Sequence, residues 1–128
     1  MELPQDSYRE FSQEYAKGGI RAVIFVNGGA AVATLSQLTA LSNLFPKSAI
    51  GIALISFIIG ILFGVLTWVA GFISNRHVDR KLRNQEKTYL SADIWMYIGI
   101  FLSLLSISAF AFGCLRLAVA FMIDNPAC

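Results

Sequence analysis

Hydrophobic residues in this chain are concentrated in long runs. Residues 49–73 contain no charged side chain, and residues 94–115 form a second uncharged run. A helix of about 20 apolar residues, rising about 1.5 Å per residue, crosses the roughly 30 Å hydrocarbon core of a bilayer. A soluble domain of this size could not bury two such segments. The pattern therefore predicts two membrane-spanning helices.

A less apolar stretch, residues 22–44, precedes these runs and is the third candidate span. Its neutral polar side chains are Asn27, Thr34, Ser36, Gln37, Thr39, Ser42 and Asn43. Polar groups at membrane depth must bond to one another, to the backbone or to water. We expect this helix to span, sheltered by other helices or facing water, with a tight break at Pro46. A long interfacial or cytoplasmic helix is the alternative.

The predicted fold is an all-α membrane protein with a single membrane domain over residues 1–128. In chain order we expect an N-terminal amphipathic helix, two spans, a basic helical hairpin and a third span, at about 1–21, 22–44, 49–73, 74–91 and 94–115, the last extending to 123. Composition agrees, because 56% of the 128 residues are hydrophobic, above the usual soluble range of about 45–50%. The length leaves no room for a separate catalytic domain.

Lysine and arginine are distributed unequally between the two sides of these spans. Eight lie in the N-terminal segment and the 74–91 connection, and two, Lys47 and Arg116, lie on the other side. Cytoplasmic loops carry the excess of positive residues. We therefore expect a multi-pass protein of the bacterial cytoplasmic (inner) membrane with its N-terminus in the cytoplasm and its C-terminus outside. The acidic, aromatic first nineteen residues are unlike a cleavable leader, so we expect them to be retained.

Small residues recur every three or four positions along the second span. They are Ala53, Ser56, Gly60, Gly64, Thr67 and Gly71. On a helix these positions fall within about 80° of one another, so they form one stripe. Small stripes let helices pack closely in lipid. The partner is either another helix of this chain or a second subunit, and we expect a homo-oligomer.

The polar residues of the first span are candidates for lining a pore. The pore-lining set is Asn27, Thr34, Ser36, Gln37, Thr39 and Asn43. First helices from several subunits could enclose a weakly selective aqueous path lined by these side chains. Interhelical hydrogen bonding is the alternative, at about 0.6 kcal/mol per bond on average.

Two charged clusters flank the spans. The basic one, Arg76, Arg80, Arg83 and Lys87, has spacings that place it on one face of a continued helix. It could contact anionic lipid headgroups, bind an anionic ligand such as a nucleotide or nucleic acid, or pair within the protein. The acidic cluster consists of Asp6, Glu10 and Glu14. Because exposed ion pairs contribute only about 0–1 kcal/mol each, contacts between the two clusters could act as a gate.

Candidate chemistry for an enzyme is missing from the sequence. His77 is the only histidine, and the two cysteines have no metal-binding spacing. The sequence contains no Ser/His/Asp set, phosphate loop or dinucleotide motif. We expect no enzymatic activity, no metal and no cofactor.

In architecture the chain resembles small pore-forming membrane effectors of bacterial anti-phage defence, and it is similar to three-span phage holins. The resemblance covers the whole chain but rests on no residue motif. Holins usually place the N-terminus outside, opposite to the charge count here. The effector resemblance implies a homo-oligomeric pore that permeabilises the cytoplasmic membrane and is gated from its cytoplasmic face by an anionic ligand. The alternatives are a holin-like lysis protein and a non-conducting accessory subunit or scaffold.

Overall fold

The computed structural model describes the backbone of residues 5–124 and the side chains of residues 10–123. This part of the chain is helical throughout, apart from short connections. The helices are α1 (Gln5–Ser36), α2 (Leu38–Leu44), α3 (Lys47–Leu82) and α4 (Leu90–Asp124). Three of them are long and apolar enough to cross a membrane, over Glu10–Ser36, Lys47–Leu82 and Leu90–Ile123. The predicted all-α class with three candidate spans is confirmed.

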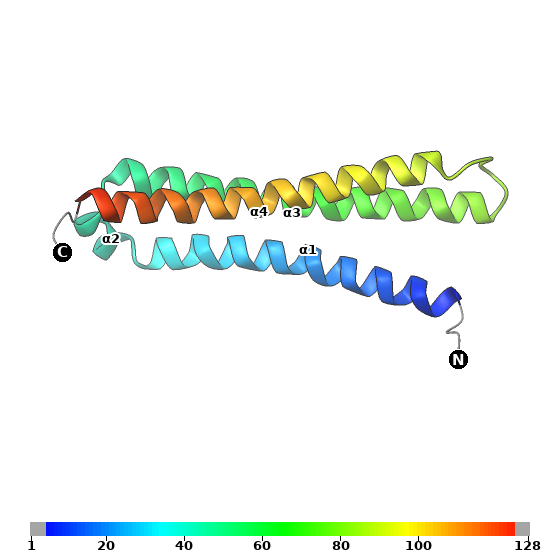
Figure 1. Ribbon diagram of the computed structural model, residues 1–128, viewed down its shortest axis with the longest axis horizontal. Coiled ribbons are helices and arrows are strands. Elements are labelled where there is room, and N and C mark those ends of the chain that lie inside the picture. Colours follow the sequence, from blue (N-terminus) through cyan, green and yellow to red (C-terminus); the bar gives the residue numbers. More distant parts are fainter. Residues whose placement is uncertain (1–4, 125–128) are drawn as a thin grey trace.

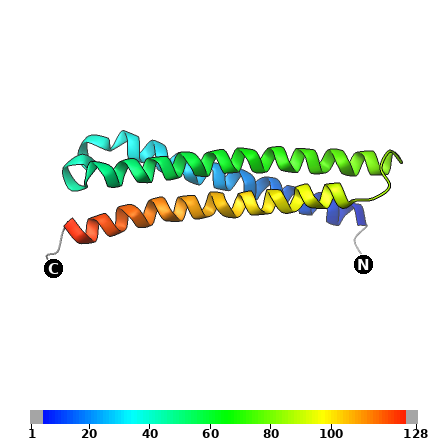
Figure 2. The same ribbon diagram turned by 90° about the horizontal axis from the view of Figure 1, so that it is seen from above.

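Figures 1 and 2 show how the three long helices are arranged. Helices α3 and α4 form an antiparallel pair that stays side by side along its whole length. Helix α1 crosses this pair at an angle and diverges from it toward the N-terminus. The N-terminal half of α1 and the α3–α4 connection lie at one end of the bundle, which we call the connection end, and α2 lies at the other.

Helix α1 is continuous from the N-terminal segment into the first span, as expected, but it ends earlier than predicted. It stops at Ser36, and a turn at Gln37 separates it from α2. At this turn the Ala33 carbonyl accepts both the Gln37 N–H and the Ser36 hydroxyl. The first candidate span therefore lies within the described part of α1 and ends at Ser36, not at 44 as predicted.

The tight break before the second span is confirmed at Pro46. Phe45 is extended, with φ −129° and ψ 150°, and Pro46 is the N-cap of α3. A residue that precedes proline is disfavoured in helical conformation, and proline is tolerated at a helix start because no backbone N–H is needed there. The chain can therefore reverse direction between α2 and α3 within two residues.

Helix α3 continues beyond its apolar run, but not as far as the basic spacing predicted. Asn84 adopts a left-handed conformation with φ 58°. Its N–H donates to the Lys81 carbonyl, and the Gln85 N–H donates to the Arg80 carbonyl. This pair of bonds is a Schellman motif, which ends a helix by satisfying its last carbonyls. Lys87 therefore lies in the connection, and the predicted four-residue helical face is wrong.

The core lies where the three long helices meet. Phe57 is 1% exposed, and its ring is 5.9 Å from that of Phe110 on α4. Ala31 of α1 and Ala53 of α3 complete this cluster. Gly113 makes room for the Phe57 ring, because an added Cβ would lie 2.5 Å from its Cε1 atom. Most large apolar side chains instead point outward along the bundle, as expected for helices surrounded by lipid.

Candidate functional site

A buried polar junction joins all three long helices near the middle of the bundle. The Nδ2 group of Asn27 on α1 donates to the Val23 carbonyl at 2.9 Å and to the Ser106 carbonyl at 3.2 Å. The Ser106 hydroxyl on α4 donates to the Gly60 carbonyl on α3 at 2.7 Å. Asn27 is 1% exposed and Ser106 is fully buried. Interhelical hydrogen bonds of this kind hold apolar helices in a defined register.

Gly60 allows the junction to close. A Cβ at this position would overlap the Asn27 amide group. Helix α1 can therefore approach α3 this closely only because glycine has no Cβ. The Asn27 Oδ1 atom is buried and accepts no hydrogen bond from the described residues; it faces the Gly60 Cα. A weak Cα–H···O contact is the interaction this arrangement offers to the oxygen.

The small-residue stripe of α3 is used inside the chain. Ala53, Ser56, Gly60, Gly64 and Thr67 are all buried, whereas Gly71 is only partly covered. An added Cβ at Gly64 would lie 2.6 Å from Ile24 of α1. The stripe therefore serves the first of its two predicted partners, the chain's own helices.

The predicted pore-lining residues are divided between two environments. Asn27 and Thr34 are buried, and the Thr34 hydroxyl donates to the Ala30 carbonyl of its own helix. Their burial removes them as candidates for a lining between subunits. The remaining four, Ser36, Gln37, Thr39 and Asn43, are exposed. These four lie at the end of the bundle opposite the connection, around the turn between α1 and α2 (Figure 1).

A second small-residue stripe lies on the outward face of α1. It consists of Gly18, Ala22, Gly29, Ala33 and Ser36, all exposed, and the large exposed side chain of Phe25 interrupts it between Ala22 and Gly29. These positions fall within about 60° on a helix, on the side opposite Asn27. An added Cβ at Gly18 or Gly29 would meet nothing within 4 Å. This outward stripe was not predicted, although its spacing of three to four residues can be seen in the sequence. The prediction for this segment was based on its polar residues instead.

A cleft of about 710 Å³ opens between the N-terminal half of α1 and the α3–α4 pair. Residues from Ser12 to Val23, Thr67 to Val78 and Ala92 to Ile107 line it. It exists because α1 contacts the pair closely at Asn27 and then diverges toward the connection end (Figure 1). Both tryptophans of the chain, Trp68 and Trp95, are among the lining residues.

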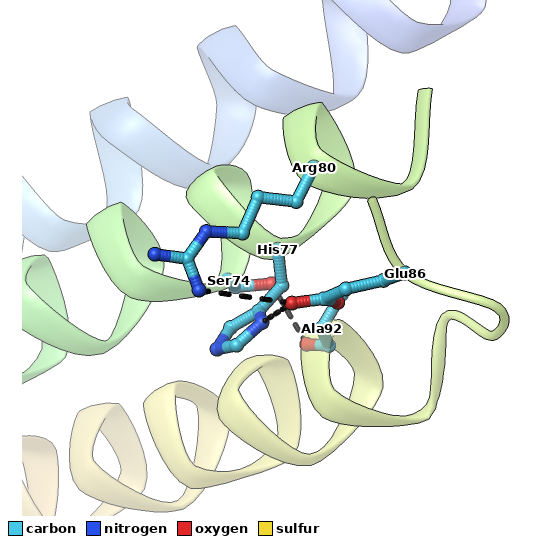
Figure 3. A network of polar contacts seen from close by, with 5 residues as sticks. All are labelled: Ser74, His77, Arg80, Glu86 and Ala92. Atoms are coloured by element: carbon cyan, nitrogen blue, oxygen red, sulfur yellow. Dashed lines mark hydrogen bonds and ion pairs between the residues drawn. The ribbon is translucent and has the colours of Figure 1, made fainter. Parts of the chain in front are cut away.

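The α3–α4 connection is held by a small polar network (Figure 3). The Ser74 hydroxyl donates to the Ala92 carbonyl at 2.8 Å. The Glu86 carboxylate lies 2.8 Å from His77 Nδ1 and 3.8 Å from Arg80 Nη1. Loop residue Glu86 therefore contacts two side chains of α3, which fixes the path of the turn.

The basic cluster and the acidic cluster do not meet in the described part of the chain. Arg80 pairs with Glu86, and Arg83 pairs with Asp79 at 3.1 Å. Glu10 and Glu14 are exposed and make no ion pair among the described side chains. Asp6 lies outside the residues whose side chains are described. Within one chain the expected gate contact is therefore replaced by local pairs.

Arg76 and Lys87 are exposed, and no carboxylate of the described side chains pairs with either. Over the same residues, no group of three His, Cys, Asp or Glu side chains could hold a metal ion.

No protein-family model, curated protein or solved structure matches this chain. A function must therefore be argued from the surfaces described above.

Proposed function

We propose that this chain is a membrane protein that assembles into a homo-oligomeric pore, with the α1 helices of several copies gathered around the path. The observation that carries the proposal is the outward stripe of α1. Helix α1 is the least apolar of the three candidate spans, yet only 17% of its most apolar window is buried within one chain. The uncovered surface includes the outward stripe, together with the exposed side chains of Phe25, Val32 and Leu35.

In a bilayer, the outward stripe must be covered by lipid, by another helix or by water. Small side chains give lipid tails little to pack against, whereas they let a second helix approach closely. A small and partly polar face can also border water at low cost. A neighbouring copy of α1 would pack against the stripe. A ring of α1 helices would also enclose water that the stripe could border.

The proposed orientation follows the positive residues. With the connection end in the cytoplasm, Arg76, Arg83 and Lys87 would be exposed to anionic lipid headgroups or to an anionic cytoplasmic ligand. Arginine forks suit the phosphates of a nucleotide or nucleic acid. Control of the pore by such a ligand would fit a bacterial defence effector.

The test is current recording from the purified protein in planar bilayers, compared with two leucine variants. Ala33→Leu places bulk on the outward stripe, and Ala111→Leu makes the same change at an exposed position of α4. We expect discrete current steps from the wild type and from Ala111→Leu. For Ala33→Leu we expect lost or reduced unit conductance, with a parallel loss of oligomers in native mass spectrometry.

Oligomers that carry no current would contradict the pore and favour a non-conducting scaffold. Equal currents from both leucine variants would contradict the role of α1. Adding a short oligonucleotide to the connection side tests ligand control, which should shift the open fraction in the wild type and not in Arg76→Gln.

A further inference from the structure

We propose that the cleft between α1 and the α3–α4 pair is a binding site for one membrane phospholipid from the leaflet at the connection end. The site is independent of the pore, because its walls come from a single chain. Three features support this site: the length of the cleft, the order of polar and apolar residues along it, and a rim lysine that pairs with no carboxylate of the described side chains.

The length of the cleft matches one leaflet. On α4 its lining extends from Ala92 to Ile107, which is about 22 Å of helix at 1.5 Å per residue. Half of a bilayer, headgroups included, is about 20–22 Å thick. The cleft ends where Asn27 and Ser106 close the bundle, near the middle of the apolar spans. An acyl chain that entered from the connection end would therefore terminate at the polar junction.

The lining changes from polar to apolar in the order in which a phospholipid does. The rim at the connection end carries Ser12, Gln13, Lys17, Asn75 and Asp93, and the deep part carries apolar residues such as Ile20, Ile100 and Ile107. The two deep hydroxyls are already used, because Thr67 donates to the Phe63 carbonyl and Ser103 donates to Thr67. The deep wall therefore suits hydrocarbon.

Lys17 has the charge that a lipid phosphate requires. It is exposed at the rim, and no carboxylate of the described side chains pairs with it. A lysine near a membrane surface attracts anionic groups by about 1 kcal/mol. Asp93, also at the rim, can accept a hydrogen bond from a headgroup ammonium. This pair of charges fits phosphatidylethanolamine, whose headgroup carries both signs.

The cleft can be filled by one substitution that has a matched control. Gly71 lines the cleft, and an added Cβ there meets nothing within 4 Å. Gly71→Leu should therefore occupy the cleft without displacing a helix. Gly51→Leu makes the same change on the same helix, outside the cleft, where an added Cβ also meets nothing within 4 Å.

The experiment titrates delipidated protein in detergent with phosphatidylethanolamine or with diacylglycerol of the same acyl chains, read by native mass spectrometry. We expect one tightly held phosphatidylethanolamine per chain in the wild type and in Gly51→Leu, and loss of this species in Gly71→Leu. Lys17→Gln should weaken phosphatidylethanolamine binding by about fivefold, without affecting the weaker binding of diacylglycerol.

Three results would overturn the proposal. Equal lipid binding by Gly71→Leu and Gly51→Leu would mean that lipid surrounds the protein without a site. An unchanged ratio of the two lipids in Lys17→Gln would remove the headgroup contact. A dimer that forms only when the cleft is open, and that carries no lipid, would assign the cleft to a second copy of the chain. Circular dichroism of each variant verifies that the helices are intact.

Discussion

The α3–α4 pair and α1 are attached to the bundle in different ways. Small residues and hydrogen bonds join α3 to α4 from the Phe57–Gly113 contact to the Ser74–Ala92 bond at the connection end. Helix α1 is joined to the pair chiefly around Asn27, Ile24 and Ala31, and its N-terminal half diverges. The α3–α4 pair is therefore held along much of its length, whereas the position of α1 depends on a few contacts.

The comparison also explains why two similar small-residue stripes have different roles. The stripe of α3 is covered by the chain's own helices, whereas the outward stripe of α1 is uncovered. Small residues permit close approach but do not choose a partner. The partner is the helix whose side chains fit the space beside the small residues, as the Asn27 amide fits beside Gly60.

The largest effect is expected from Gly60→Leu. A side chain at this position would overlap the Asn27 amide and push α1 from the pair, and overpacking of this kind costs about 1–3 kcal/mol. Unfolding in mixed detergent, followed by circular dichroism, measures the loss. The control is Gly51→Leu, and equal stability of the two variants would contradict the close approach at Gly60.

A smaller effect is expected from breaking the junction's hydrogen bonds. In a double-mutant cycle, Asn27→Leu and Ser106→Ala should show a coupling of at least about 0.6 kcal/mol, the average for polar pairs in a membrane bundle, and at most about 1.7 kcal/mol, the maximum found there. The same cycle between Ser36→Ala and Ser106→Ala should show none, because Ser36 bonds within its own helix. Absence of coupling at Asn27 would mean that α1 is held by apolar packing alone.

The α3–α4 pair should respond less to loss of its bond at the connection end. Ser74→Ala removes the hydrogen bond to the Ala92 carbonyl, and we expect a loss of about 0.5–1 kcal/mol because water can reach this end. Hydrogen exchange at the first turns of α4 should increase, with exchange at α1 unchanged. Faster exchange at α1 instead would show that the pair and α1 open together.

The smallest effect is expected from Arg83→Ala. Its pairing with Asp79 is exposed and one helical turn apart, and such pairs contribute about 0.3–0.5 kcal/mol. The end of α3 should be unaffected, since the Schellman motif at Asn84 depends on backbone bonds. A helix that frays after this substitution, detected by NMR shifts of Lys81 and Leu82, would assign the stop to the side chain.

Much of the fold could be predicted from the sequence. The two uncharged runs, the break at Pro46 and the continuation of the N-terminal segment into the first span all follow from local composition. The ends of α1 and α3 could not be predicted as well. Helix α1 is interrupted by a turn at Gln37, and α3 ends at the left-handed backbone of Asn84. The regular spacing of polar or charged residues passes through both positions unchanged.

The candidate site was less predictable. Asn27 was predicted either to line a pore or to bond between helices, but its environment depends on Gly60 and Ser106, which lie far away in the chain. The spacing of the basic cluster predicted one helical face only on the assumption that the helix continues to Lys87, and α3 ends before it. The cleft could not be predicted from the sequence, because it depends on the angle between α1 and the α3–α4 pair, whose residues are distant from α1 in the chain.

The sequence by itself determined that this protein has three apolar helices, that the chain breaks at Pro46 before the second long apolar run, and which positions carry small side chains. These are properties of neighbouring residues, set by hydrophobicity and by helix geometry. Only the tertiary structure decided which small face is covered, that Asn27 is enclosed between helices and that α1 leaves a cleft. The physical reason is that the fit of side chains between distant segments, such as the Asn27 amide against Gly60, produces no pattern in the local sequence.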